Sequence, residues 1–492
     1  MRTNTLVIFF LFCFLVDAAA QKHDYIWPFG YLNSPSNPPN SPYGGAYIDF
    51  NQVPTAGVKN NRVLNFGLAG SACSDSSGNL LFYTNGLAIH NYLDQLMENG
   101  DTINPGDWWD GSANTGYNNQ TGSFPLPYPR HPNMYVYFHT GVLYDIDSSY
   151  VRKSPLYYTI IDMNANGGEG KVIQKNQILM EGDLGWPAAC KHGNGRDWWI
   201  TIYKPNHPEQ FTFLLSPSGI TGPFVQVIGP ATYPEFIGKS LFSPNGKTYI
   251  RHDVNNGPRI MDFDRCTGLF SNLRILAYPD EIYSWSAAFS PDSRYLYLSK
   301  PSLVTRIDLL ANNINTSFDT LGRYNLSHCA TDPSETRVFQ MQEGPDGKIY
   351  CSSDGDSRCM TRIEQPLLPG LAADLYYGGF DLPRSHLCTI CHFPSYRLGE
   401  WDNAPCDTIN FQQPGDGFYA SRYTPSEANA EKSLLSEPYK IFPVACEPNE
   451  AARKEKNELG DMRKLEYNLW LNRKDAIETK SRPYSKTHTK NE

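Results

Sequence analysis

The chain has 492 residues with 42 basic and 51 acidic side chains, so its formal net charge is −9. Charged residues make up 19% of the chain and hydrophobic residues 40%, with 37 prolines and 39 glycines. This composition excludes a collagen-like chain, a highly charged disordered chain and a coiled coil, and the length allows a sizeable core. The acidic balance argues against nucleic acid as the main partner.

Residues 1–20 have the pattern of a secretory signal peptide. Arg2 supplies the positive start, Leu6 to Val16 is an unbroken apolar run, and three alanines at 18–20 form a small-residue cleavage site. No later segment has the roughly 18 consecutive apolar residues of a membrane helix. We therefore expect an exported protein, secreted or held at the outer cell surface, with no transmembrane segment in the mature chain.

The cysteines fit an exported protein. The chain has 11 cysteines, and removal of Cys13 with the signal peptide leaves an even number. In an oxidising compartment this predicts disulfides, although the pairing cannot be read from the sequence.

A strand–turn–strand unit recurs along the chain. A small or apolar lead-in is followed by a turn rich in Ser, Pro, Asp, Asn and Gly, and then by a strand of aromatic and β-branched residues. Proline presets the first turn position, and Asn, Asp or Gly accepts the strained one. The turns of the clearest copies are 74–78, 243–246, 290–293 and 344–347, and weaker copies are at 131–133 and 192–195.

The spacing of these units predicts a β-propeller. The three best copies, with turns beginning at 243, 290 and 344, follow one another at the period of about 40 to 50 residues that is typical of four-stranded blades. We expect an all-β chain with a single propeller of six or seven four-stranded blades over residues 22–411, of the WD-repeat or YVTN kind. The segments 22–66 and 378–411 are expected to pair and close a seventh blade. A pair of β-sandwiches is the alternative all-β fold.

The composition changes after the predicted propeller. Residues 412–445 are interpreted as a linker with short apolar stretches, and residues 446–492 as a charged tail. A weak apolar stripe near 455–471 predicts that the tail is partly helical.

Several stretches together resemble one family. The sequence is similar to the secreted propeller proteins of bacteria that use type IX secretion, and the matching stretches extend over most of residues 24–410. They are Phe66 to Gly86, Met97 to Asp101, Tyr157 to Lys175, His192 to Trp199, Phe263 to Asn272, Phe289 to Tyr297, Gly344 to Tyr350 and Phe393 to Asp407.

The resemblance implies an extracellular or outer-surface propeller of largely unassigned activity. Relatives usually end in a short β-sandwich that directs export and surface attachment. Here Tyr439 to Pro443 fits the start of that sorting domain, whereas Val444 and Ala445 depart from it. The region 412–445 therefore resembles the remnant of a sorting domain that is degenerate or lost.

The motif Cys388-Thr389-Ile390-Cys391-His392 matches the attachment pattern of c-type haem, in which two thiols bind the vinyl groups and the histidine ligates iron. The surrounding strands are not the small helical fold that usually encloses such a haem. A disulfide or free thiols at Cys388 and Cys391, with a structural His392, is the other interpretation.

Acidic turns are candidate calcium sites. Asp145 with Asp147, and Asp354 with Asp356, offer clustered oxygens, although neither pair has the full EF-hand spacing. Solvated turn carboxylates are the alternative. We expect no required cofactor, with Ca²⁺ as the candidate ion.

The connection 101–130 is the longest insertion between predicted strands. Its Trp108, Trp109, Asp110 and Tyr117 are candidate ligand-binding residues, since long loops on a rigid scaffold often carry binding function.

Two functions compete. The first is a monomeric binding or scaffold module that recognises an extracellular or cell-envelope protein or glycan, without catalysis. The second is a calcium-dependent hydrolase of the lactonase or phosphotriesterase type, which would place Ca²⁺ and acidic or histidine residues in the central channel. An open channel with converging ligands favours the hydrolase, and a filled channel favours the binding module.

Overall fold

The computed structural model describes most of the predicted propeller. The described residues are 21–34, 37–60, 62–106, 109, 112, 116, 117, 119, 122–145, 150–232, 237–253, 256–276, 284–300, 303–323, 328, 329, 332–335, 337–388, 390–401 and 406. The predicted signal peptide, the tail 446–492 and the linker 412–445 lie outside them.

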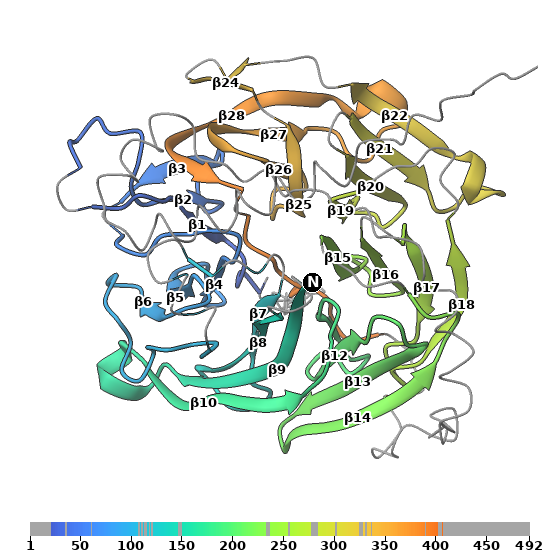
Figure 1. Cartoon of the computed structure of the whole chain (residues 1–492), viewed down its shortest axis with the longest axis horizontal. Helices are drawn as coiled ribbons and strands as arrows, with labels where there is room; N and C mark the ends of the chain where they lie inside the picture. The colour runs from blue at the N-terminus through green and yellow to red at the C-terminus, as the bar shows by residue number, and fades with distance from the viewer. Residues whose placement is uncertain are drawn as a thin grey trace, which may run out of the picture.

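Seven antiparallel sheets are arranged in a ring around a central axis (Figure 1). This confirms the predicted propeller and fixes the blade count at seven. Within the described residues, two blades have three strands and five have four. The first blade has β1(Ile26–Phe29), β2(Ala46–Asp49) and β3(Ala56–Lys59), and the second has β4(Ser71–Ser74), β5(Leu80–Thr84) and β6(Ile89–Asn91). The third has β7(Ser123–Pro127), β8(Met134–Asp145), β9(Tyr150–Asp162) and β10(Lys171–Met180), the fourth has β11(Ala188–Lys191), β12(Trp198–Tyr203), β13(Glu209–Ser216) and β14(Gly219–Val227), and the fifth has β15(Gly238–Phe242), β16(Thr248–Asp253), β17(Arg259–Phe263) and β18(Phe270–Ile275). The sixth has β19(Ser286–Phe289), β20(Tyr295–Lys300), β21(Leu303–Asp308) and β22(Phe318–Arg323), and the seventh has β25(Val338–Glu343), β26(Ile349–Ser353), β27(Asp356–Ile363) and β28(Leu375–Leu387).

A two-stranded sheet of β23(His328–Cys329) and β24(Asp332–Glu335) lies beside the last blade. Three short 3₁₀ turns are described, η1(Ala165–Gly168), η2(Ile314–Thr316) and η3(Gly370–Ala373), and Trp109 and Ser112 also have a helical backbone.

The first strand of each blade lies nearest the axis and packs beside the first strands of its neighbours, as β1 does with β4 and β15 with β19. These inner strands are crowded and often carry small residues, as in Ser286–Phe289. The second strands are largely apolar because neighbouring blades cover both of their faces. In β12 and β20 every residue is buried.

The repeated turns have the geometry that their sequences predict. In the turn 243–246 the Gly246 amide donates to the Ser243 carbonyl at 2.8 Å, and the Gly347 amide donates to Gly344 at 3.0 Å. The residue that completes each turn has a left-handed backbone, with φ of 70° at Gly246 and 76° at Gly347. This conformation is free of penalty for glycine and sharply reverses the chain into the second strand.

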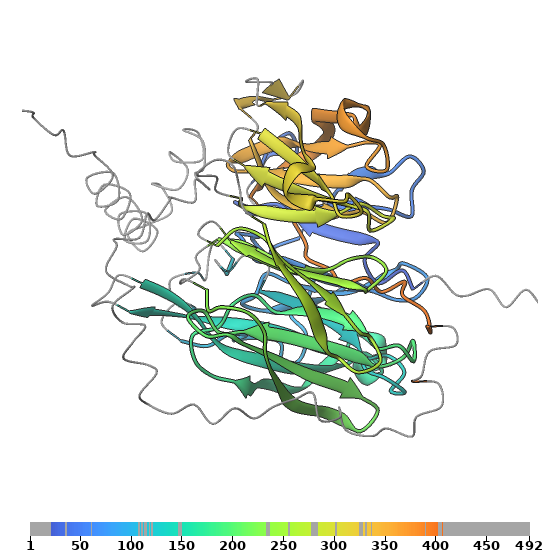
Figure 2. The ribbon, with the colours of Figure 1, turned by 90° about the vertical axis from the view of Figure 1, so that its right-hand side faces the viewer.

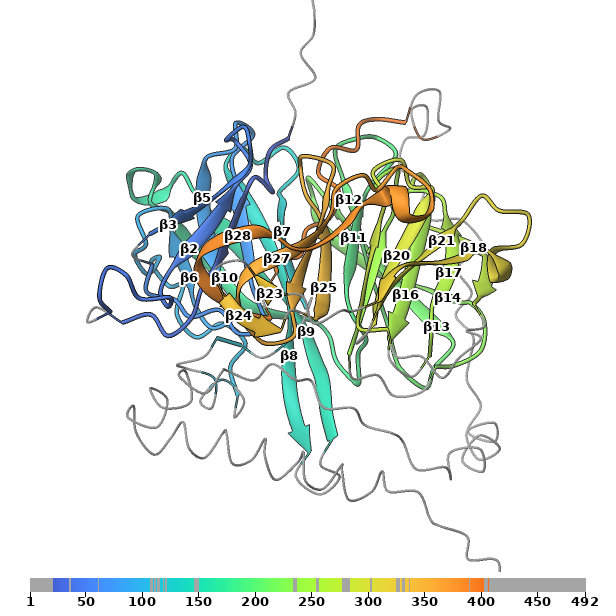
Figure 3. The same cartoon turned by 90° about the horizontal axis from the view of Figure 1, so that it is seen from above.

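The ring has two different faces. The turns that join first and second strands lie on one face, which we call the turn face. The longer connections between blades and the β8–β9 hairpin lie on the other, which we call the loop face. Seen edge-on and from above, the hairpin extends beyond the loop face, and the chain after β28 leaves the ring on the turn face (Figures 2 and 3).

The prediction that segments 22–66 and 378–411 pair in one closing blade is wrong. The first blade is formed by 26–59 and the last by 338–387, and no described sheet mixes strands of the two. The residues after β28 instead turn inward to the axis. Among the described residues, no helix is long and apolar enough to cross a membrane.

Candidate functional site

Residues 390–401, which we call the plug, run through the middle of the ring (Figure 1). The side chains of the plug contact the inner strands of several blades. The Tyr396 hydroxyl donates to the carbonyl of Pro125 in β7 at 2.6 Å, and the Phe393 ring lies 5.8 Å from that of Trp27 in β1. The plug therefore fills the part of the channel that these blades surround.

Two cations, the exposed Arg397 and the buried Lys191, fix the plug on the turn face. Arg397 donates to Asp24 at 2.8 Å, and Asp24 is 3% exposed. Burial raises the pKa of Asp24, and the neighbouring Arg397 opposes that shift. The ammonium of Lys191 donates to the carbonyl of Tyr396 at 2.9 Å.

Apolar side chains pack together on the loop-face side of the channel. A buried apolar cluster forms where the inner strands begin and the plug leaves β28. Its members are Leu68, Ile237, Trp285, Phe339 and Cys388.

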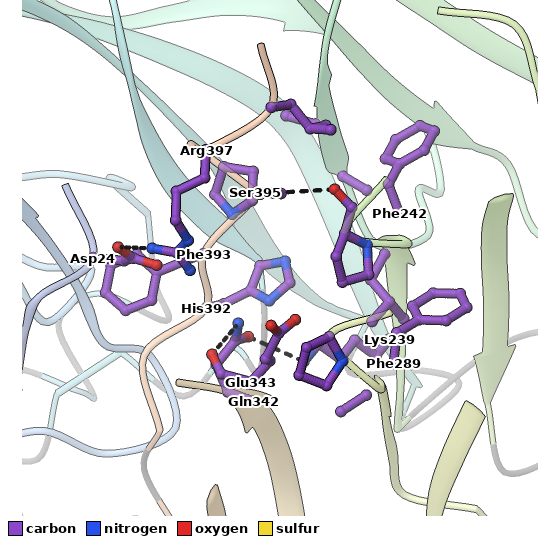
Figure 4. Close-up of a pocket in the computed structure, with 18 residues that line it drawn as sticks. Asp24, Lys239, Phe242, Phe289, Gln342, Glu343, His392, Phe393, Ser395 and Arg397 are labelled. Atoms are coloured by element: carbon purple, nitrogen blue, oxygen red, sulfur yellow. Dashed lines mark hydrogen bonds and ion pairs between the residues drawn. The ribbon is translucent and has the colours of Figure 1, made fainter. Parts of the chain in front are cut away.

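A pocket of about 260 Å³ remains beside the plug on the turn face (Figure 4). Its walls come from Asp24, the plug, and the inner strands β11, β15, β19 and β25 with their turns. Pro244 and Pro291 of the repeated turns lie at its rim. The polar side chains in its lining are Asp24, Lys239, Gln342, Glu343, His392, Ser395 and Arg397.

Lys239 of β15 is 1% exposed and reaches across to β25. Its ammonium donates to the carbonyl of Met341 at 2.6 Å and to the Gln342 side-chain oxygen at 3.3 Å. Burial lowers the pKa of Lys239 to about 7. One of its three protons has no partner among the described residues.

Glu343 ends β25, and its carboxylate points into the pocket (Figure 4). Burial raises the pKa of Glu343 to about 7, and the positive charge of Arg397 opposes that shift. Within the part of the chain that the structure describes, no group donates a hydrogen bond to this carboxylate.

His392 of the plug is 5% exposed and lies between Phe124 of β7 and the pocket. Its Nδ1 atom is buried without a hydrogen-bond partner in the described structure. Burial lowers the pKa of His392 well below its ordinary value, and the nearby Lys239 adds to this effect. The ring is therefore neutral.

This pocket was not predicted from the sequence. Lys239, Gln342 and Glu343 stand in strands that the repeat predicts, but nothing in the repeat marks them as facing an axis. The sequence signal that could have identified these pocket residues is the position of each one relative to the repeated turn that follows it. Glu343 and Phe242 come directly before the turns 344–347 and 243–246, so the repeat brings them to the same mouth of the channel.

The predicted ligand loop is only partly described, since Trp108 and Asp110 lie outside the described residues. Tyr117 is 2% exposed, and its hydroxyl accepts the Val142 amide at 2.7 Å. The Trp109 side chain packs against the same cluster and donates to the carbonyl of Leu87 at 3.3 Å. Tyr117 is therefore a core residue that anchors the connection, contrary to the surface role we expected.

Of the two predicted acidic turns, the structure describes the side chains of one. Asp354 is buried and pairs with Arg337 at 3.2 Å, and Asp356 is buried at the start of β27. Asp147 and the side chain of Asp145 lie outside the described structure. In the described ranges, no group of three or more His, Cys, Asp or Glu side chains could hold a metal ion.

The Cys-x-x-Cys-His motif lies where the chain enters the channel. Cys391 is a free, buried thiol whose sulfur lies 3.7 Å from the carbonyl of Pro28, so it is not paired with Cys388. Cys388 belongs to the apolar cluster at the loop face. A haem attached here would need the space that these packed side chains occupy.

A different cysteine pair lies beyond the end of the plug. The sulfur atoms of Cys266, in the turn after β17, and Cys406 are 2.10 Å apart. Cys73, Cys190 and Cys351 are buried free thiols.

No family model and no curated protein matches the sequence. Solved structures match at the level of fold. A candidate 6-phosphogluconolactonase from Bacteroides uniformis is 12% identical with a TM-score of 0.42, covering 75% of this chain and 97% of its own. A protein from Lactobacillus plantarum is 10% identical with a TM-score of 0.43, covering 75% and 98%. The β-propeller domain of Cps50 (Swd1) from Myceliophteria thermophila is 8% identical with a TM-score of 0.38, covering 63% and 86%. Similarity at this level assigns no activity or ligand to this chain.

Proposed function

We propose that this protein is an exported β-propeller that acts as a binding or scaffold module for a protein or glycan at the cell surface or outside the cell. The observation that supports a non-catalytic role is the plug. A channel hydrolase needs converging ligands around an accessible metal. Here the plug, held by Tyr396 and Arg397, runs through that space.

The loop face is the binding surface in this proposal. The β8–β9 hairpin extends beyond it (Figure 3), and the connection 101–122 is anchored beside the hairpin through Tyr117 and Val142. A rigid ring that presents long connections on one face is a common arrangement for recognition.

Export is the second part of the proposal. The signal-peptide pattern of residues 1–20 and the resemblance to propellers exported by type IX secretion support it. In this proposal Cys266 and Cys406 form a disulfide in the oxidising compartment. Mass spectrometry of the native protein should find a mature start at Gln21 and Cys266 linked to Cys406. Retention of residues 1–20, or free thiols at both positions, would contradict export.

The test of binding uses the full mature chain as bait for native cell-envelope and secreted fractions. One variant replaces residues 143–152 by Asn-Gly, which shortens the β8–β9 hairpin. A control variant, Leu310→Ser, changes a side chain that is 75% exposed in the turn after β21. We expect saturable partners that the shortened variant loses and the control retains.

Two results would count against the binding module. The first is the absence of any saturable partner in either fraction. The second is calcium-dependent hydrolysis of lactones or phosphotriesters by the wild-type protein, which would support the hydrolase instead.

A further inference from the structure

The channel pocket contains polar groups whose hydrogen-bonding capacity the described protein does not use. Among the described residues, Nδ1 of the buried His392 has no hydrogen-bond partner, no group donates to the half-buried Glu343 carboxylate, and one proton of Lys239 is unused. Unpartnered buried polar atoms cost free energy unless water or a ligand meets them. A pocket of about 260 Å³ has room for such an occupant.

The walls of the pocket are both apolar and polar. Apolar lining comes from Ala189 and Ala288 of the inner strands and from Pro244 and Pro291 of the repeated turns, whereas the rings of Phe242 and Phe289 point away from the polar groups (Figure 4). Small-ligand sites combine apolar walls with a few placed polar groups. Pockets for drug-sized ligands have volumes of roughly 300–1,000 Å³, so this one suits a smaller molecule.

The charges of the lining balance. Asp24 and Arg397 neutralise each other in an ion pair, and one acidic group, Glu343, stands against one basic group, Lys239. A charged ligand would be desolvated here without gaining a net countercharge. A neutral ligand avoids that cost.

Hydroxyl groups fit both kinds of polar partner. A carboxylate only accepts hydrogen bonds and an ammonium only donates them, whereas a hydroxyl does both. A ligand with several hydroxyls can therefore donate to Glu343 and accept from Lys239. Its apolar C–H surface can lie against the proline and alanine side chains of the lining.

We propose that the pocket formed by Lys239, Glu343 and His392 beside the plug binds a neutral polyhydroxylated molecule of about the size of one monosaccharide. Glu343 accepts hydrogen bonds from its hydroxyls, Lys239 donates to one of them, and the neutral His392 ring contacts another. This site is separate from the loop-face surface proposed above and does not depend on it, because it lies on the turn face.

Ligand-observed NMR and thermal melting of the full mature chain test this site. The neutral probes are glucose, galactose, mannose, xylose, myo-inositol and glycerol. Ethylammonium and inorganic phosphate serve as cationic and anionic probes. The variants are Glu343→Gln and Lys239→Met, with Glu181→Gln as a matched control at an exposed position outside the pocket.

Glu343→Gln should remain folded, because it removes a desolvated charge that no described group binds. We expect saturable binding of at least one neutral probe, weakened at least tenfold in Glu343→Gln and in Lys239→Met and unchanged in Glu181→Gln. Binding of only the ionic probes, binding that Glu343→Gln leaves intact, or no saturable binding of any probe would overturn the proposal. Loss of fold in Lys239→Met leaves the comparison of Glu343→Gln with Glu181→Gln to decide.

Discussion

The carboxyl group of Glu343 is held where its ionised form is poorly stabilised. Its pKa is raised from 4.5 to about 7 by burial. Between these pH values the folded protein holds a proton that the unfolded chain has released. The free energy of unfolding must therefore fall as the pH rises through this window, and the loss is complete above about pH 7.

Glu343→Gln removes this dependence. We expect the variant to gain stability relative to wild type between pH 4.5 and pH 8, by on the order of 2–3 kcal/mol. Urea unfolding at several pH values in the absence of polyols measures the difference. A stability difference between the two proteins that stays constant across this range would show that the carboxyl is not desolvated.

Alanine substitutions at two turn glycines can separate the cost of backbone strain from the cost of crowding by neighbouring atoms. Gly246 and Gly347 both have left-handed backbones, but an added Cβ at Gly246 would lie 2.8 Å from Arg265 and 2.9 Å from Cys190. At Gly347 the nearest atom would be 3.8 Å away, in Pro291. We expect Gly347→Ala to cost about 1 kcal/mol and Gly246→Ala clearly more, about 2–3 kcal/mol, in chemical denaturation. Equal costs would contradict the packing at Gly246.

At the scale of single elements, the plug depends on the ion pair between Arg397 and Asp24. The Asp24 side chain is 4% exposed and that of Arg397 is 36% exposed. Arg397→Met leaves the buried carboxylate without its partner, so we expect a loss of about 2 kcal/mol in the free energy of unfolding at pH 7.

The double variant Asp24→Asn with Arg397→Met provides the control. Since it removes the buried charge together with its partner, we expect it to recover part of the loss. Denaturation of the four proteins of this cycle gives the coupling. A double variant whose loss equals the sum of the two single losses would show that the pair is not coupled.

The elements that could be predicted from sequence are those whose structure is local. The turn 243–246 is specified by its own residues, and the alternation of the following strand specifies burial. The plug could not be predicted this way, because it has no regular structure and its contacts, such as Tyr396 with Pro125, join distant residues. Tyr117 was misassigned for a similar reason: an aromatic residue in a long connection looks exposed until the β8–β9 hairpin covers it.

For the whole molecule, the period of the repeat was enough to predict the propeller but not how it closes. Only six repeat units could be counted in the sequence, so segments 22–66 and 378–411 were predicted to pair and form a seventh blade. In the structure each terminal blade is formed by its own segment of the chain, and residues 390–401 run along the axis. The pocket was unpredictable because Lys239, Glu343 and His392 lie far apart in sequence and meet only when the ring has closed.

The link between Cys266 and Cys406 joins the fifth blade to the chain after the plug and closes a loop with a sequence separation of 140 residues. If this disulfide forms in the native protein, Cys266→Ser should lower the free energy of unfolding by about 3 kcal/mol under oxidising conditions. Thermal melts with and without dithiothreitol provide the measurement. Because Cys359 and Cys388 are also disulfide-bonded, reductant should lower the melting temperature of both proteins but that of the wild type more, and an equal effect on both would contradict the Cys266–Cys406 bond.

The position of the plug also determines when the molecule can be completed during synthesis. The contact of Cys391 with Pro28 spans 363 residues, and that of Arg397 with Asp24 spans 373. The ribosome must therefore synthesise nearly all of the described chain before the segment around the first blade can contact the plug. Until then the nascent polypeptide lacks its final packing. Under the export proposed above, the chain would cross the membrane before this last packing forms.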